Sequence, residues 1–162
     1  MKDSTKAKDE IALNTGKGIA EALQINTNMV LRLFDEHGNL KDERLVHNTV
    51  TTAGKNGVAD QILASPTLVK MGWMAVGTGT PTSTLLGGEI SRVAFTSKTR
   101  NTNVITVVGD YAAGVGTGAI TEAGTFDVVT ANTVNMWMSA SFSVINKGSL
   151  DSLSISWTLS IS

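Results

Sequence analysis

Residues 152–162, SLSISWTLSIS, alternate apolar and hydroxyl-bearing side chains without interruption. The apolar set is Leu153, Ile155, Trp157, Leu159 and Ile161. Because successive side chains of an extended chain point to opposite faces, this period of two predicts a β-strand with one face in the core. Residues 133–145, TVNMWMSASFSVI, alternate in the same way, and NKGSLDS between the two runs supplies turn residues. We therefore expect these two strands to form a hairpin.

Further strands are expected towards the N-terminus. Residues 30–36 and 40–48 predict an early hairpin that turns at Gly38 and Asn39. Residues 92–100 and 103–113 predict another hairpin around NTN, and residues 118–129 predict one more strand. The sequence therefore predicts a mainly β fold, an antiparallel β-sandwich or open barrel of about seven or eight strands.

One packed helix is expected among these strands, at about residues 53–64. Thr52 is its candidate N-cap and Pro66 its stop, although two glycines inside it lower helix propensity. Its expected apolar side consists of Val58, Ile62 and Leu63.

The charged residues are unevenly distributed along the chain. Residues 1–60 hold nine acidic and eight basic residues, whereas residues 61–162 hold only five of each. This contrast predicts an extended N-terminal arm, residues 1–28, followed by a β-sandwich domain, residues 29–162. Within the arm, residues 16–24 predict a short helix, which needs a packing partner because isolated helices of this length are marginal in water.

Composition excludes several classes of protein. The chain has no cysteine, so it has no disulfide framework, thiol nucleophile or cysteine-based metal site. Its net charge of −1 provides no overall field that would attract nucleic acid or an anionic membrane. No apolar run approaches the ~18 residues of a membrane span, and MKDSTKAKDE does not resemble a secretory signal. We expect a soluble protein without nucleic-acid or membrane partners.

The glycine-rich stretch MAVGTGTPTSTLLGGEISR, residues 74–92, raises the question of a phosphate-binding loop. A dinucleotide fingerprint requires a third glycine where Thr82 stands, and no Walker sequence is present. We expect a corner instead, in which Gly77 and Gly79 end one strand and residues 85–92 begin the next.

Candidate catalytic and metal-binding groups are sparse. His37 and His47 are the two histidines, and the serine motif G-x-S-x-G is absent. The acidic pairs at 35–36 and 42–43 surround one hairpin tip and are interleaved with basic residues, which favours a solvated tip over a calcium loop. The acids of the β region could face one another across a glycosidase cleft or pair with Arg92 or Arg100, and we favour the second reading. These acids are Glu89, Asp110, Glu122 and Asp127. We expect no catalytic residue, cofactor or metal.

The tryptophans divide between two environments. Trp157 is in phase with the apolar face of its strand and is expected in the core. Trp137 is out of phase with Met136 and Met138, so it faces the other way. If exposed, Trp137 would be a candidate interface residue, and the alternative is a second packed layer.

Five short motifs occur in one order along residues 50–160: TTAG, MAVGTG, LGGEISR, ITEAGTFD and NK. In this order the chain resembles the N-terminal domain of phage tail-collar fibres, a family of structural proteins of tailed bacteriophages. The motif residues are Thr52–Gly54, Met74–Gly79, Leu86–Arg92, Ile120–Asp127 and Asn146–Lys147.

The resemblance implies a non-enzymatic virion protein that binds other virion proteins of the capsid, collar or tail. It implies a homo-oligomer, with trimers usual in such proteins, assembled in the host cytoplasm. It makes Glu89, Arg92 and Glu122 structural polar anchors. The glycines Gly77, Gly79 and Gly124 then serve turns and strand pairing.

The chain departs from the family in its length after the domain. Collar-fibre domains begin long chains, whereas this sequence stops at Ser162. We therefore expect a small accessory of the capsid or collar, of the decoration or cement type. A fibre adaptor, or a receptor- or glycan-binding module on the particle surface, is the alternative. The arm is expected to attach to the virion through Ile11, Leu13, Ile19 and Leu23.

Overall fold

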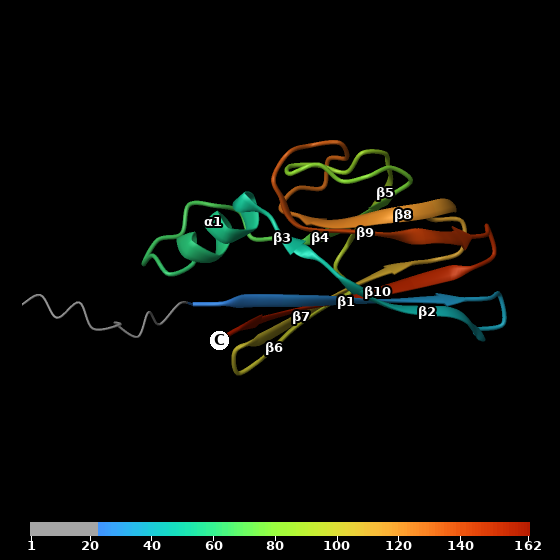
Figure 1. Ribbon diagram of the computed structural model, residues 1–162, viewed down its shortest axis with the longest axis horizontal. Helices are drawn as coiled ribbons and strands as arrows, with labels where there is room; N and C mark the ends of the chain where they lie inside the picture. Colours follow the sequence, from blue (N-terminus) through green and yellow to red (C-terminus); the bar gives the residue numbers. More distant parts are fainter. Residues whose placement is uncertain (1–22) are drawn as a thin grey trace, which may run out of the picture.

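The computed structural model describes residues 23–162, which form two five-stranded antiparallel sheets packed face to face (Figure 1). The first sheet has the order β2 (Leu40–His47), β1 (Ile25–Phe34), β10 (Ser152–Ile161), β7 (Val104–Tyr111) and β6 (Ser97–Asn101). The second has the order β3 (Thr49–Val50), β9 (Met136–Lys147), β8 (Gly118–Phe126), β4 (Trp73–Gly77) and β5 (Glu89–Ala94). One helix, α1 (Thr52–Asp60), lies at one end (Figure 1). The predicted β-sandwich is confirmed, with ten strands in the described residues instead of seven or eight.

The core lies between the sheets and is built from the alternating strands. Trp157 is fully buried, as its phase predicts, and its strand neighbours are Met29 on β1 and Val107 on β7. The early hairpin of β1 and β2 and the hairpin of β6 and β7 are both confirmed. Residues 92–100 do not form one strand, however, because the chain crosses from β5 in one sheet to β6 in the other.

The predicted hairpin between the last two strands is wrong. β9 pairs with β8 and β3, whereas β10 pairs with β1 and β7, so the two strands belong to opposite sheets. The turn between them is fixed by local bonds: the Gly148 amide donates to the Asp151 carboxylate at 2.8 Å, and Lys147 donates to the Asp151 carbonyl at 2.6 Å. Turn residues reverse the chain direction whether the next strand joins the same sheet or the opposite one. Because both strands have an apolar face, the two can cover one core from opposite sides.

The predicted boundary of the N-terminal arm is corrected by four residues. β1 begins at Ile25, and just before it the Gln24 amide donates to the Ser162 carbonyl at 2.7 Å. Residues 25–28 therefore belong to the sandwich. Ile11, Leu13 and Ile19 lie outside the described residues, as does most of the short helix predicted at 16–24.

Helix α1 packs through its glycines, and the predicted apolar side is wrong except at Val58, which is half-buried. Ile62 and Leu63 lie beyond the helix and are 78% and 59% exposed, whereas Gly54 and Gly57 are buried against Trp137. Thr51, not Thr52, is the N-cap, and its side chain accepts from the Gly54 amide at 3.1 Å. Close approach of the helix to the sheet decides the packing face here, because only glycine leaves room for the indole. Within residues 23–162, no helix is long and apolar enough to cross a membrane.

We predict that Gly57→Ala destabilises the protein, although alanine is the better helix former. Propensity alone would stabilise a helix by about 1 kcal/mol. A Cβ at this position would overlap the Trp137 ring, and overpacking of this kind costs about 1–3 kcal/mol. Urea unfolding of this variant should be compared with that of Asn56→Ala, an exposed position on the same helix. Equal stabilisation by both substitutions would show that the indole does not limit the helix.

Asp60 at the end of α1 holds the loop that follows. Its carboxylate accepts from the Leu68 amide at 2.9 Å and from the Thr67 amide at 3.2 Å. These bonds, that from Leu68 first, hold the pKa of Asp60 below its usual 3.8. A lowered pKa stabilises the fold above pH 3.8, and this contribution is lost as the pH falls through the folded value.

We therefore predict that Asp60→Asn reduces the loss of stability on acidification below pH 3.8. Thermal unfolding between neutral and acidic pH, for both chains, measures the effect. Parallel pH profiles would contradict the assignment.

Candidate functional site

The corner after β4 is a binding loop for an internal carboxylate. Pairing of β4 with β8 sets Gly77 opposite Glu122, whose side chain is fully buried. Glu122 Oε1 accepts from the amides of Gly88 at 2.7 Å and Gly79 at 3.0 Å, and Oε2 accepts from that of Gly87 at 2.9 Å. The loop thus gathers amide donors around an anion, as phosphate-binding loops do, but the anion belongs to its own chain.

The positions around this carboxylate require glycine, because a Cβ atom there would clash with neighbouring atoms. A Cβ on Gly77 would overlap Glu122 Oε1, and one on Gly79 would lie 2.7 Å from the Gly87 carbonyl carbon. On β8, a Cβ at Gly124 would lie 2.7 Å from Met136 Sδ. Glu122 therefore approaches the backbone so closely that larger residues at 77 and 79 would displace it.

Glu89 and Arg92 form a second buried anchor on β5. Residues three apart on a regular strand face opposite sides, but the β4–β5 register shifts between Val76 and Gly77, and this bulge turns both side chains the same way. Arg92 Nε and Nη2 each donate to one carboxylate oxygen of Glu89 at 2.8 Å. The two side chains are only 2% and 1% exposed, and the guanidinium lies 3.7 Å from the centre of the Phe126 ring.

The same ion pair fixes the loop that follows β8. Arg92 Nη1 donates to the Val128 carbonyl at 2.8 Å, and Glu89 Oε2 accepts from the Asn132 amide at 3.0 Å. In this loop, burial raises the pKa of Asp127. Arg92 and Glu89 therefore connect β5 to a loop about forty residues further along the chain.

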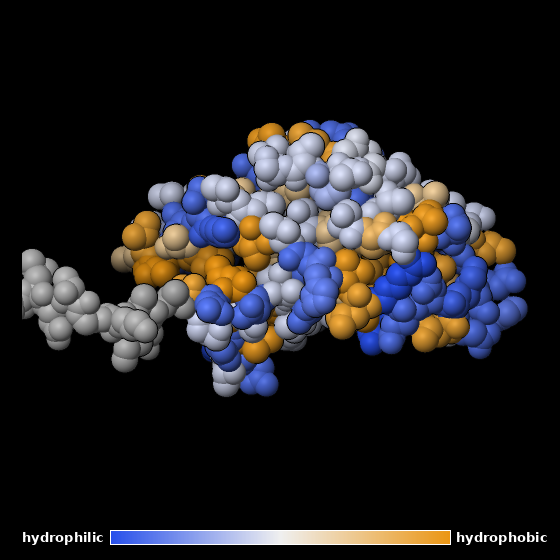
Figure 2. Space-filling model, in the orientation of Figure 1, coloured by the Kyte–Doolittle hydropathy of each residue, from blue (hydrophilic) through white to orange (hydrophobic). Residues whose placement is uncertain are grey.

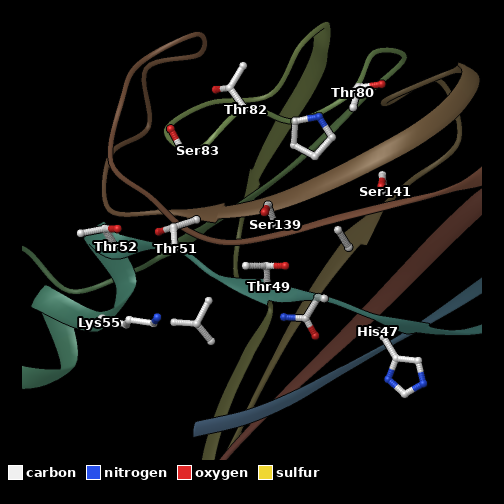
Figure 3. A pocket seen from close by; sticks show the side chains of 14 residues that line it. His47, Thr49, Thr51, Thr52, Lys55, Thr80, Thr82, Ser83, Ser139 and Ser141 are labelled. Atoms are coloured by element: carbon white, nitrogen blue, oxygen red, sulfur yellow. The ribbon is translucent and has the colours of Figure 1, made fainter.

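A polar cleft of about 470 Å³ opens beside the loop that Glu122 holds (Figure 3). Thr80, Thr82 and Ser83 of this loop form one wall, and the cleft extends across Ser139 and Ser141 of β9 to the segment from His47 to Lys55. The side-chain amide of Asn48, also in the lining, is buried and has no hydrogen-bond partner among the described residues. Hydroxyls, an amide and one lysine suit a neutral or weakly anionic ligand rich in hydroxyl groups.

The other predicted polar residues are dispersed. His37 lies in the exposed β1–β2 turn, 3.7 Å from Glu36, whereas His47 lies at the polar cleft. Asp110 accepts from the hydroxyls of Thr96 at 2.7 Å and Ser154 at 2.6 Å. Within residues 23–162, no group of three or more acidic or histidine side chains could hold a metal ion.

Trp137 is covered in the structure, so the stated alternative of a second packed layer holds and the candidate interface does not. Trp137 does point away from the core, but α1 covers it and leaves it 7% exposed. Glycine spacing in residues 54–57 was the one sequence signal for this contact. The polar cleft had no such signal, because its walls come from segments that are distant in sequence.

No family model, curated protein or solved structure matches this chain. The resemblance to collar-fibre domains therefore stays a prediction.

Proposed function

We propose that the protein is a non-enzymatic structural component of a tailed-bacteriophage particle, a small accessory of the capsid or collar that binds other virion proteins. Homo-oligomerisation, with a trimer as the expected form, belongs to the proposal. So does attachment through the N-terminal arm, of which the exposed Leu23 is the described part.

One observation carries the proposal: the side chains of three charged residues of the resembling motifs, Glu89, Arg92 and Glu122, are buried inside the fold. Glu122 is saturated by backbone amides, and Glu89 and Arg92 bind each other and a neighbouring loop. Reactive groups need access to a substrate, whereas these groups contact only the protein itself. This arrangement supports a scaffold whose motif residues maintain its shape.

The edge strand β2 supports binding to other proteins. Leu40 and Leu45 on this strand are 54% and 67% exposed, and one long side of β2 has no partner strand within the described sheet. Exposed apolar side chains at a sheet edge are suited to contacts between subunits.

The polar cleft favours a second candidate, a glycan-binding module on the particle surface. Binding of the full-length protein to a glycan array, and its loss in a Ser83→Ala, Ser141→Ala double variant, would support that function. Absence of binding to any glycan would remove it.

The proposed virion role is tested on particles from a lysate that contains the protein. After density-gradient purification and a high-salt wash, an antibody should detect the protein in the particle band at a fixed ratio to the major capsid protein. Recovery only in the soluble fractions would overturn the proposal.

A further inference from the structure

An apolar groove of about 670 Å³ lies between α1 and the adjoining end of the sandwich. Trp137 and Met138 of β9 and Val107 and Leu159 of the facing sheet are among its lining residues. Apolar surface gathers over this end of the molecule in the space-filling view (Figure 2). Ile62 and Leu23 in its lining are 78% and 67% exposed, and exposed apolar side chains that adjoin an apolar groove mark a surface suited to a binding partner.

The charges at this groove are all of one sign. Lys70, Lys98 and Arg100 line it, and no carboxylate is among its described lining residues. Lys98 and Arg100 are two apart on β6, so they project from the same face of that edge strand. An occupant should therefore combine apolar side chains with at least one acidic group.

The position of the first described residue indicates which segment could occupy the groove. Leu23, the first described residue, is itself part of the lining. Upstream of it, residues 9–13 are DEIAL, in which Asp9 and Glu10 directly precede Ile11, and Lys6 and Lys8 lie on the N-terminal side of the two acids. NTGKG, residues 14–18, separates this stretch from Ile19 and supplies turn residues that allow the chain to fold back.

We propose that this groove binds the N-terminal segment of its own chain, with Ile11, Leu13 and Ile19 against the apolar floor and Asp9 and Glu10 facing the three cations. The reach is sufficient, because Leu23 itself lines the groove, nine residues lie between Leu13 and Leu23, and an extended chain covers up to about 3.3 Å per residue. Tethering at Leu23 gives the segment a high effective concentration at the groove, so a modest contact suffices. This inference replaces virion attachment through Ile11, Leu13 and Ile19, because side chains that occupy the chain's own groove cannot contact another virion protein. It does not depend on the rest of the proposed virion role.

The test uses the full-length protein and anilinonaphthalene sulfonate, an anionic dye that fluoresces in apolar sites. Ile11→Asp with Leu13→Asp should empty the groove and raise dye fluorescence several-fold over the wild type. Thr5→Asp with Thr15→Asp is the matched control, because it adds the same two charges to the same segment, and it should leave the fluorescence unchanged. Equal dye binding by all three chains would overturn the proposal.

A charge exchange tests the acidic contact independently. Asp9→Lys with Glu10→Lys should speed amide hydrogen exchange at residues 11–13, and adding Lys98→Glu with Arg100→Glu should slow it again. Failure of the second pair to restore protection would contradict the proposed contact.

Light scattering distinguishes docking within one chain from exchange between copies. The wild type and the Ile11→Asp, Leu13→Asp variant should have the same mass. A lower mass for the variant would show that the segment binds another copy, which would overturn the intrachain proposal.

Discussion

Glu122→Ala should lower the free energy of unfolding by on the order of 4 kcal/mol. The substitution removes the charged acceptor of three part-buried hydrogen bonds, those from the amides of Gly79, Gly87 and Gly88. A hydrogen bond to a charged group contributes about 1.5–3 kcal/mol, and water at this partly exposed loop offsets some of the loss. Since domains of this kind are stable by only about 5–15 kcal/mol, the loss would be a large part of the total.

Urea unfolding at neutral pH measures this loss, with Glu36→Ala as the matched control. Glu36 is an exposed carboxylate in a turn, and its removal should change stability by less than about 0.5 kcal/mol. Glu122→Gln keeps one acceptor oxygen but turns an NH₂ group towards the donors, so it should be intermediate. If Glu122→Ala were as mild as the control, the loop would not depend on this carboxylate.

Arg92→Met should cost about 3–5 kcal/mol, because it leaves the buried Glu89 carboxylate without its cation. Methionine retains much of the contact with Phe126 but none of the bonds to Glu89 or Val128. Removing both charges, as Arg92→Met with Glu89→Gln, should be less damaging than the sum of the two single substitutions.

A double-mutant cycle from thermal or urea unfolding provides the coupling energy of this pair. Arg32 and Glu43 on β1 and β2 provide the control, because they form an exposed ion pair at 2.5 Å whose coupling should stay below about 1 kcal/mol. A coupling between Arg92 and Glu89 no larger than this would contradict a structural role for the buried pair.

Elements with strong local patterns were predictable from the sequence. Alternation identified β10 and the core position of Trp157, and a glycine turn between two such runs identified the β1–β2 hairpin. Both signals act within about twenty residues, where side-chain period and turn chemistry decide the structure.

Pairing between distant strands was not predictable in the same way. The turn at residues 148–151 looks like a hairpin turn, yet it joins opposite sheets, because the partner of each strand is set by the whole core. The helix face was also missed, since the contact of Gly54 and Gly57 with Trp137 depends on how close the helix lies to the sheet.

The candidate site was partly predictable. Gly77 is confirmed as the end of β4, whereas Gly79 lies two residues beyond it and the next strand begins at Glu89, not at residue 85. The occupation of this corner by Glu122 depends on the β4–β8 register. The Glu89–Arg92 contact depends on a bulge that a three-residue spacing does not reveal. The polar cleft and the apolar groove arise only when separate segments come together.

The central claim, that the motif carboxylate is an internal anchor, is tested most directly by amide hydrogen exchange in NMR spectra of the full-length protein. The amides of Gly79, Gly87 and Gly88 should exchange slowly in the wild type and at nearly the rate of an open loop in Glu122→Ala. Slow exchange only in the wild type would support an internal anchor. Fast exchange of all three amides in the wild type would show that Glu122 does not hold the loop, and the carboxylate would then be available for a ligand or a reaction.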